Sequence, residues 1–138
     1  MKPNRIHHIG IVFPDFEKAK DIMEMFGLEV DYQGFIEAYK ADVYFTKFGK
    51  WESPIEFIIP KEGVLTRFNN GKGGLHHICF EVDNAVAATR EFTEKGYQML
   101  EEAPVIGACN DVVNFMRPRS SHGVLFEFLE ELHPKNRE

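Results

Sequence analysis

The sequence predicts an α+β fold built from two tandem repeats, each with a strand, a helix and three further strands. The first observation is a pair of similar segments: Ile-His-His-Ile-Gly-Ile-Val near the N-terminus and Leu-His-His-Ile-Cys-Phe-Glu-Val in the middle of the chain. The second is a shared spacing, because His8 and His77 lie 69 residues apart and Glu56 and Glu127 lie 71 residues apart. A nearly constant spacing across most of both halves indicates an internal repeat.

Local patterns assign the elements of each repeat. Apolar, β-branched runs bounded by Pro, Gly or Asn predict strands, while Asp15 and Gly27 are typical of the first and last positions around a helix. For the first repeat we expect a strand over Ile6–Val12, a helix over Phe16–Phe26 and strands over Leu28–Gly34, Ala41–Phe48 and Ile55–Ile59. For the second repeat we expect a strand over Leu75–Val82, a helix that follows Asp83 and Asn84 and ends at Gly96, and strands over Tyr97–Glu101, Val112–Arg117 and Gly123–Leu129.

We expect one domain over residues 1–138, because a half of about 69 residues would bury too small a core to fold alone. The first repeat covers about residues 5–60, a linker with three glycines covers 61–73, and the second repeat covers about 74–130. A short helical turn is expected within the linker, at Val64–Phe68. Hydrophobic residues make up 43% of the chain and include 13 Phe, which is enough to fill a shared core.

Composition narrows the classes of partner. The net charge is −6 and no long run of Lys or Arg occurs, which argues against nucleic acid and against a membrane surface. We therefore expect a small-molecule partner. The two cysteines, Cys79 and Cys109, lack metal-ligand spacing, and the N-terminus resembles neither a signal peptide nor a membrane span. These features predict a cytoplasmic protein.

Two carboxylates stand inside apolar strands and require a partner. Glu56 lies in Ile-Glu-Phe-Ile-Ile and Glu127 in Leu-Phe-Glu-Phe-Leu, where an unpaired buried charge would be costly. One metal ion shared with His8 and His77 would satisfy all four side chains. Because strand side chains alternate between faces, the neighbouring His7 is interpreted as structural.

Several motifs together resemble the vicinal oxygen chelate superfamily, which includes glyoxalase I, methylmalonyl-CoA epimerase, bleomycin and fosfomycin resistance proteins and extradiol dioxygenases. The motifs are Gly-Leu-His-His-Ile-Cys-Phe-Glu-Val-Asp-Asn ending at Asn84, Gly-Val-Leu-Phe-Glu ending at Glu127, His-Ile-Gly-Ile-Val starting at His8, and Pro118-Arg-Ser120. They are most similar to the epimerase branch. The resemblance implies two βαβββ modules whose mixed sheet curls into a cup around a metal.

By the family's pattern, one divalent ion would be held by His8, Glu56, His77 and Glu127. Nitrogen and oxygen ligands suit Co²⁺, Ni²⁺, Zn²⁺ or Mn²⁺, and the sequence does not choose among them. Glutamate at position 56 is a departure, since epimerases often carry glutamine there whereas glyoxalase I carries glutamate.

The resemblance implies an isomerase or epimerase that moves a proton next to a metal-chelated carbonyl, as methylmalonyl-CoA epimerase does. The catalytic candidates are Glu127, Glu56 and Glu37, with Glu56 acting either as a ligand or as a displaced base. Epimerases usually place a further acid/base glutamate at the position of Ala38. Glu37 is one residue away and can serve only if a bulge or a shifted loop turns its side chain.

Two alternatives use the same cup. A glyoxalase I-like lactoylglutathione lyase would act on a glutathione hemithioacetal instead of an acyl-CoA thioester. A non-catalytic, resistance-type protein would only bind a small molecule, although such proteins normally lack the four ligands. An extradiol dioxygenase would use two His and one carboxylate, so the fourth ligand argues against it. The resemblance also leaves room for a homodimer.

Overall fold

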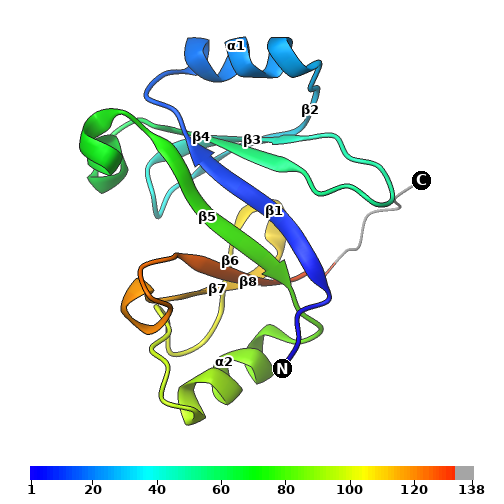
Figure 1. The fold of residues 1–138 in the computed structure, drawn as a ribbon, viewed down its shortest axis with the longest axis vertical. Coiled ribbons are helices and arrows are strands. Elements are labelled where there is room, and N and C mark those ends of the chain that lie inside the picture. Colours follow the sequence, from blue (N-terminus) through cyan, green and yellow to red (C-terminus); the bar gives the residue numbers. More distant parts are fainter. Residues whose placement is uncertain (133–138) are drawn as a thin grey trace. The chain divides into compact units, whose positions relative to one another are not determined.

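The computed structural model describes residues 1–132, so the predicted domain of 1–138 ends outside the described residues. The first repeat contains β1 (Arg5–Val12), α1 (Phe16–Phe26), β2 (Val30–Ile36), β3 (Ala41–Thr46) and β4 (Ile55–Pro60), followed by the 3₁₀ helix η1 (Val64–Gly71) (Figure 1). The second contains β5 (Gly74–Glu81), α2 (Ala85–Glu94), β6 (Val105–Ile106), η2 (Ala108–Asn110), β7 (Val112–Met116), η3 (Pro118–Ser120) and β8 (Phe126–Glu130). The α+β class and the βαβββ order of both repeats are confirmed.

The two repeats share one strand order and one register. The order is β2-β3-β4-β1 in the first repeat and β6-β7-β8-β5 in the second. In each, the first strand is parallel to the last, and the remaining pairs are antiparallel, which makes the sheet mixed. Glu56 lies opposite Gly10 in β1, and Glu127 lies opposite Cys79 in β5. The two carboxylates therefore occupy equivalent positions, as their spacing predicted.

The chain divides into two compact units, which are described separately. The first comprises Ile9–His76, and we call the second the His77 unit, because it begins at His77 and also includes Met1–His8. The strands β1 and β5 each contribute to both units. Among residues 1–132, no helix is both long and apolar enough to cross a membrane.

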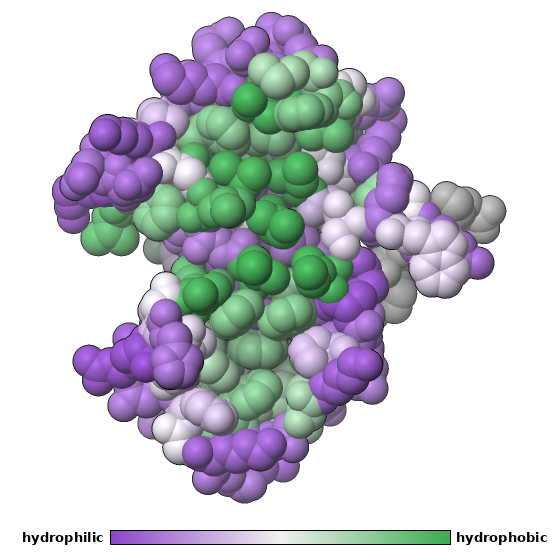
Figure 2. Space-filling model, viewed as in Figure 1, coloured by the Kyte–Doolittle hydropathy of each residue, from purple (hydrophilic) through white to green (hydrophobic). Residues whose placement is uncertain are grey.

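In the Ile9–His76 unit, α1 covers the sheet with its apolar side. The Asp15 carboxylate accepts a hydrogen bond from the Lys18 backbone N–H, and Gly27 ends the helix in the left-handed conformation. These are the predicted caps. The buried side chains between helix and strands are Ala19, Met23, Phe57 and Ile59. The outer surface of α1 is largely hydrophilic in Figure 2.

In the His77 unit, α2 packs on β7 and β8 in the same way. The cap lies in the region predicted from Asp83 and Asn84: the Asn84 side chain accepts a hydrogen bond from the Ala87 backbone N–H. The core beneath the helix consists of Val82, Ala85, Ala88, Met116 and Phe128. The outer side of α2 is again hydrophilic, while hydrophobic residues gather over the strands (Figure 2).

The predicted strand over Tyr97–Glu101 is wrong. Only Met99 forms a bridge there, with Met116, and the strand at that edge is β6. The reason lies in Asn114, whose buried side chain accepts from the Glu101 backbone N–H and donates to its carbonyl. A side chain thus replaces the backbone partner that a continuing ladder would need.

Other boundaries shift by a few residues. The strand predicted from Leu28 begins at Val30, because the backbone N–H of Leu28 still bonds to the carbonyl of Met23 in α1. The strand predicted from Gly123 begins at Phe126, after a turn. The helical turn expected in the linker is present at the start of η1, which is interrupted at Phe68, Asn69 and Asn70, where the backbone angles are not helical.

Gly73, just before β5, provides a test of the packing. Its φ is +76° and an added Cβ would lie 2.3 Å from the carbonyl oxygen of Val12. Gly73→Ala should therefore lower the free energy of unfolding by about 3 kcal/mol, from conformational cost and overpacking together. Gly27→Ala is the control, because Gly27 is left-handed with a φ of +64° but nothing lies within 4 Å of an added Cβ. That variant should lose only about 1 kcal/mol in the same denaturant titration. Equal losses would contradict the close approach.

Candidate metal centre

Strands β1, β5 and β8 position three side chains of the predicted site within the His77 unit. In the strand order β5 lies between β1, which carries His8, and β8, which carries Glu127. The parallel register of β5 and β8 sets Glu127 opposite Cys79, two residues beyond His77. All three side chains are buried, with 2% of His8, 6% of His77 and 8% of Glu127 exposed.

The donor atoms form a nearly equilateral triangle. Nε2 of His8 lies 3.2 Å from Nε2 of His77, and each nitrogen lies 3.1 Å from Oε1 of Glu127. Bonds of about 2.0–2.2 Å to a common ion, at octahedral or tetrahedral angles, place neighbouring ligand atoms about 2.8–3.6 Å apart. The triangle therefore has the size that one divalent ion requires.

The Glu127 carboxylate is held ionised by its neighbours. Burial is the largest influence and by itself would raise the pKa of Glu127, but the imidazoles of His77 and His8 outweigh it and lower the pKa below its usual range. Although both ring nitrogens lie 3.1 Å from Oε1, neither contact meets full hydrogen-bond geometry, so buried Oε1 is only partly satisfied. A buried anionic oxygen that is only partly satisfied requires another partner. A cation bound by these three side chains would satisfy it.

The remaining predicted site residues lie in the Ile9–His76 unit. Glu56 is buried in β4, with 7% exposed. Glu37 lies in the turn between β2 and β3, is exposed, and forms an ion pair with Lys40. The irregularity in β2 falls between Val30 and Tyr32, at the other end of that strand. A catalytic role for either glutamate stays a prediction.

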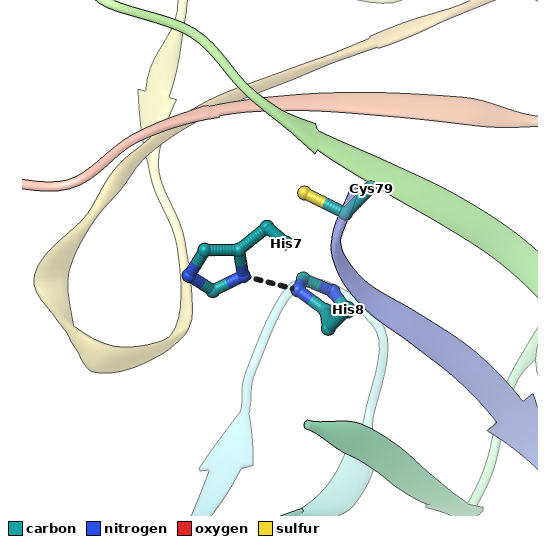
Figure 3. A group of neighbouring side chains, drawn as sticks. All are labelled: His7, His8 and Cys79. Carbon is teal, nitrogen blue, oxygen red and sulfur yellow. Dashed lines mark hydrogen bonds between the residues drawn. The ribbon is translucent and has the colours of Figure 1, made fainter. Parts of the chain in front are cut away.

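Sequence reasoning missed the surroundings of His7. It was expected to lie on the other face from His8, yet it is buried, and its Nδ1 lies 2.7 Å from Nδ1 of His8 (Figure 3). Its Nε2 lies 2.8 Å from Oε1 of Glu131. Cys79 is nearby and fully buried. No local pattern signals these contacts, since Glu131 is 124 residues away in sequence.

Comparison with known proteins identifies the family. The sequence model of the Glyoxalase/Bleomycin resistance protein/Dioxygenase superfamily matches residues 7–115. The chain belongs to this superfamily. The resemblance that the sequence motifs suggested, to the vicinal oxygen chelate proteins, is thereby confirmed. The matched stretch contains His8, Glu56 and His77, and Glu127 follows it.

Relatives within the superfamily include methylmalonyl-CoA epimerases. The chain is 32% identical to the mitochondrial enzyme of Homo sapiens over 126 residues, which covers 89% of this chain and 72% of that one. The mitochondrial enzyme of Mus musculus is 30% identical over 129 residues, covering 91% and 72%. An ethylmalonyl-CoA/methylmalonyl-CoA epimerase of Cereibacter sphaeroides is 31% identical over 129 residues, covering 89% and 95%.

Solved structures share the fold. A methylmalonyl-CoA epimerase variant of Streptomyces coelicolor in complex with 2-nitronate-propionyl-CoA matches with a TM-score of 0.88 and 24% identity, over 98% of this chain and 99% of that one. A methylmalonyl-CoA epimerase in complex with methylmalonyl-CoA and NH₄⁺ matches with a TM-score of 0.87 and 24% identity, covering 96% and 97%. At this identity the likeness establishes the architecture.

Removing one corner of the triangle should remove metal binding. We expect His77→Ala to weaken the binding of Co²⁺ or Zn²⁺ at least about 100-fold, because it deletes one of three buried ligands. Competition with a chromophoric chelator measures this. His76→Ala is the matched control, because His76 is not part of the triangle and its ring centroid lies 5.1 Å from that of Phe68. Metal binding should persist in this variant. Undiminished binding in His77→Ala would refute the assignment.

Metal should also stabilise the fold, because a cation offsets the burial of the Glu127 carboxylate. At a free metal concentration of about 100 times Kd, the gain is about 2.7 kcal/mol, which corresponds to about 10 °C in melting temperature. Thermal unfolding with metal and after chelation measures the difference. An unchanged melting temperature, with metal loss confirmed by elemental analysis, would contradict a buried site.

Proposed function

We propose that this protein is a divalent-metal-dependent epimerase that moves a proton on the carbon next to the carbonyl of an acyl-CoA thioester. The observation that carries the proposal is the triangle of His8, His77 and Glu127, whose size fits a divalent ion and whose carboxylate oxygen is only partly satisfied. The methylmalonyl-CoA epimerases among its relatives support the reaction class and the substrate class.

The three side chains would hold the ion through two imidazole nitrogens and one carboxylate. A divalent ion bound there would supply Lewis-acid polarisation of a substrate carbonyl. His8 and His77 bind as neutral imidazoles, and Glu127 contributes one negative charge. With these ligands the site would keep net positive charge, which would favour the negative charge that develops on a substrate carbonyl oxygen. Burial of all three side chains keeps bulk water away and strengthens that attraction.

Epimerisation breaks a C–H bond on one face of the carbon and forms a C–H bond on the other, so the net proton count is unchanged. Carboxylates are suitable bases for this transfer. Glu56 occupies the repeat position equivalent to Glu127, and we assign it as the fourth ligand or as a base released from the ion. Glu37 remains an outside candidate, because its exposed side chain would have to leave Lys40 to reach a substrate.

A glyoxalase I-like lyase acting on a glutathione hemithioacetal is the second candidate. Glu56 favours it, since glutamate resembles the glyoxalase I ligand at this position. The same metal chemistry serves both reactions, so the substrate decides between them. The choice among Co²⁺, Ni²⁺, Zn²⁺ and Mn²⁺ and the cytoplasmic location both stay predictions, and the human and mouse relatives are named as mitochondrial.

Solvent deuterium exchange tests the proposal. The metal-loaded protein should incorporate deuterium at the α carbon of methylmalonyl-CoA, followed by NMR or mass spectrometry. Glu127→Gln should slow this at least about 100-fold, because it removes the charge of a ligand next to the reacting group. Glu94→Gln makes the same change on the exposed side of α2 and should retain full exchange.

Parallel assays with methylglyoxal and glutathione separate the candidates. Deuterium exchange or turnover with the hemithioacetal, and none with methylmalonyl-CoA, would show that the protein is the lyase and not the epimerase. Absence of both activities in metal-loaded protein would contradict both enzymatic functions and favour a resistance-type binding protein.

A further inference from the structure

Two further side chains, His7 and Glu131, lie beyond His8 on the side of its ring that faces away from the triangle. Nδ1 of His7 lies 2.7 Å from Nδ1 of His8, and Nε2 of His7 lies 2.8 Å from Oε1 of Glu131. The two rings meet edge to face, with centroids 5.0 Å apart and planes at 79°. His7 and Glu131 are themselves largely buried, with 10% and 11% of their side chains exposed.

The positions of the protons follow from the role of His8. Its Nε2 faces the triangle and must offer a lone pair to bind a metal, so its proton is on Nδ1. That N–H then donates to Nδ1 of His7, which must accept. The proton of His7 is consequently on Nε2, where it donates to the Glu131 carboxylate. With neutral imidazoles, both short contacts are then hydrogen bonds, and His8 is free to bind the metal.

The same atoms could instead suggest a second metal site, because His7, His8 and Cys79 gather within 4.8 Å of one another (Figure 3). Two nitrogens bound to one ion at about 2.0–2.1 Å, at octahedral or tetrahedral angles, would be about 2.8–3.4 Å apart. The observed 2.7 Å is shorter than this and matches a hydrogen bond. Cys79 instead packs in an apolar cluster with Val113 and Leu129. The geometry therefore favours a hydrogen-bonded chain over a second ion.

We propose that His7 and Glu131 are positioning residues that fix the tautomer and the ring orientation of His8 for metal binding. The inference rests on the metal centre of the proposed function. A carboxylate behind the outer imidazole makes it a better acceptor, which strengthens His8 as a ligand. Loss of such a partner commonly weakens metal binding 10–100-fold. The chain of contacts lies entirely within the His77 unit.

The test compares two substitutions of His7, one that keeps the ring and one that keeps the acceptor. His7→Phe keeps a planar ring but removes the acceptor, while His7→Asn keeps an acceptor near the position of Nδ1. For His7→Phe we expect Co²⁺ affinity to fall 10–100-fold in competition titrations. His7→Asn should recover most of that loss. Melting temperatures of the metal-free variants establish that each one is folded.

A spectroscopic readout separates positioning from general support of the fold. Nitrogen-15 NMR of the metal-free protein reports which ring nitrogen of His8 carries the proton. The wild type should show the Nδ1–H tautomer, and His7→Phe should show a mixture of both tautomers. Glu131→Gln keeps an acceptor oxygen without the charge, so it should preserve the tautomer while weakening Co²⁺ binding less than His7→Phe does.

Three results would overturn the inference. The first is a folded His7→Phe variant that binds Co²⁺ as tightly as the wild type, and the second is a wild-type protein whose His8 carries its proton on Nε2. The third is binding of a second equivalent of Co²⁺ whose thiolate absorption band disappears in Cys79→Ser. The last result would establish the second metal site. If the wild type binds one Co²⁺ through the Nδ1–H tautomer of His8 but exchanges no deuterium into any substrate, the positioning role stands and the proposed function fails.

Discussion

The buried carboxylate of Glu127 is the constraint on which the site depends. Its position in an apolar strand is unfavourable by itself, and the fold compensates by placing two imidazoles 3.1 Å from the same oxygen. Those imidazoles lower the pKa of the carboxyl, so the group is charged when an ion arrives. No contact to Oε1 has full hydrogen-bond geometry, so a cation bound there would complete the partners of this oxygen.

The repeat explains how a short chain builds such a centre. A parallel pairing of first and last strand recurs in each repeat, and its register sets one glutamate beside the histidine-bearing strand both times. The repeat thus places a glutamate at equivalent register positions twice without requiring long loops. The second repeat then differs where Asn114 replaces backbone pairing by side-chain hydrogen bonds, which shortens the edge strand and leaves the metal ligands unaffected.

Much of this could be predicted from sequence because the signals are local or periodic. The caps at Asp15 and Asn84 follow from their side chains, and the spacing of His8 and His77 exposes the repeat. The contact between His7 and His8 could not be predicted, since strand alternation gives the direction of Cβ but not how far a ring turns about its side-chain torsions. The partner of His7, Glu131, depends on tertiary structure alone.

The central claim is that one divalent ion binds between His8, His77 and Glu127. Anomalous diffraction from crystals grown with Co²⁺, recorded on both sides of the cobalt absorption edge, tests it most directly. The account predicts one strong peak about 2.0–2.2 Å from Nε2 of both histidines and from a carboxylate oxygen of Glu127. A peak beside the Cys79 sulfur, or none within bonding distance of these three side chains, would contradict it.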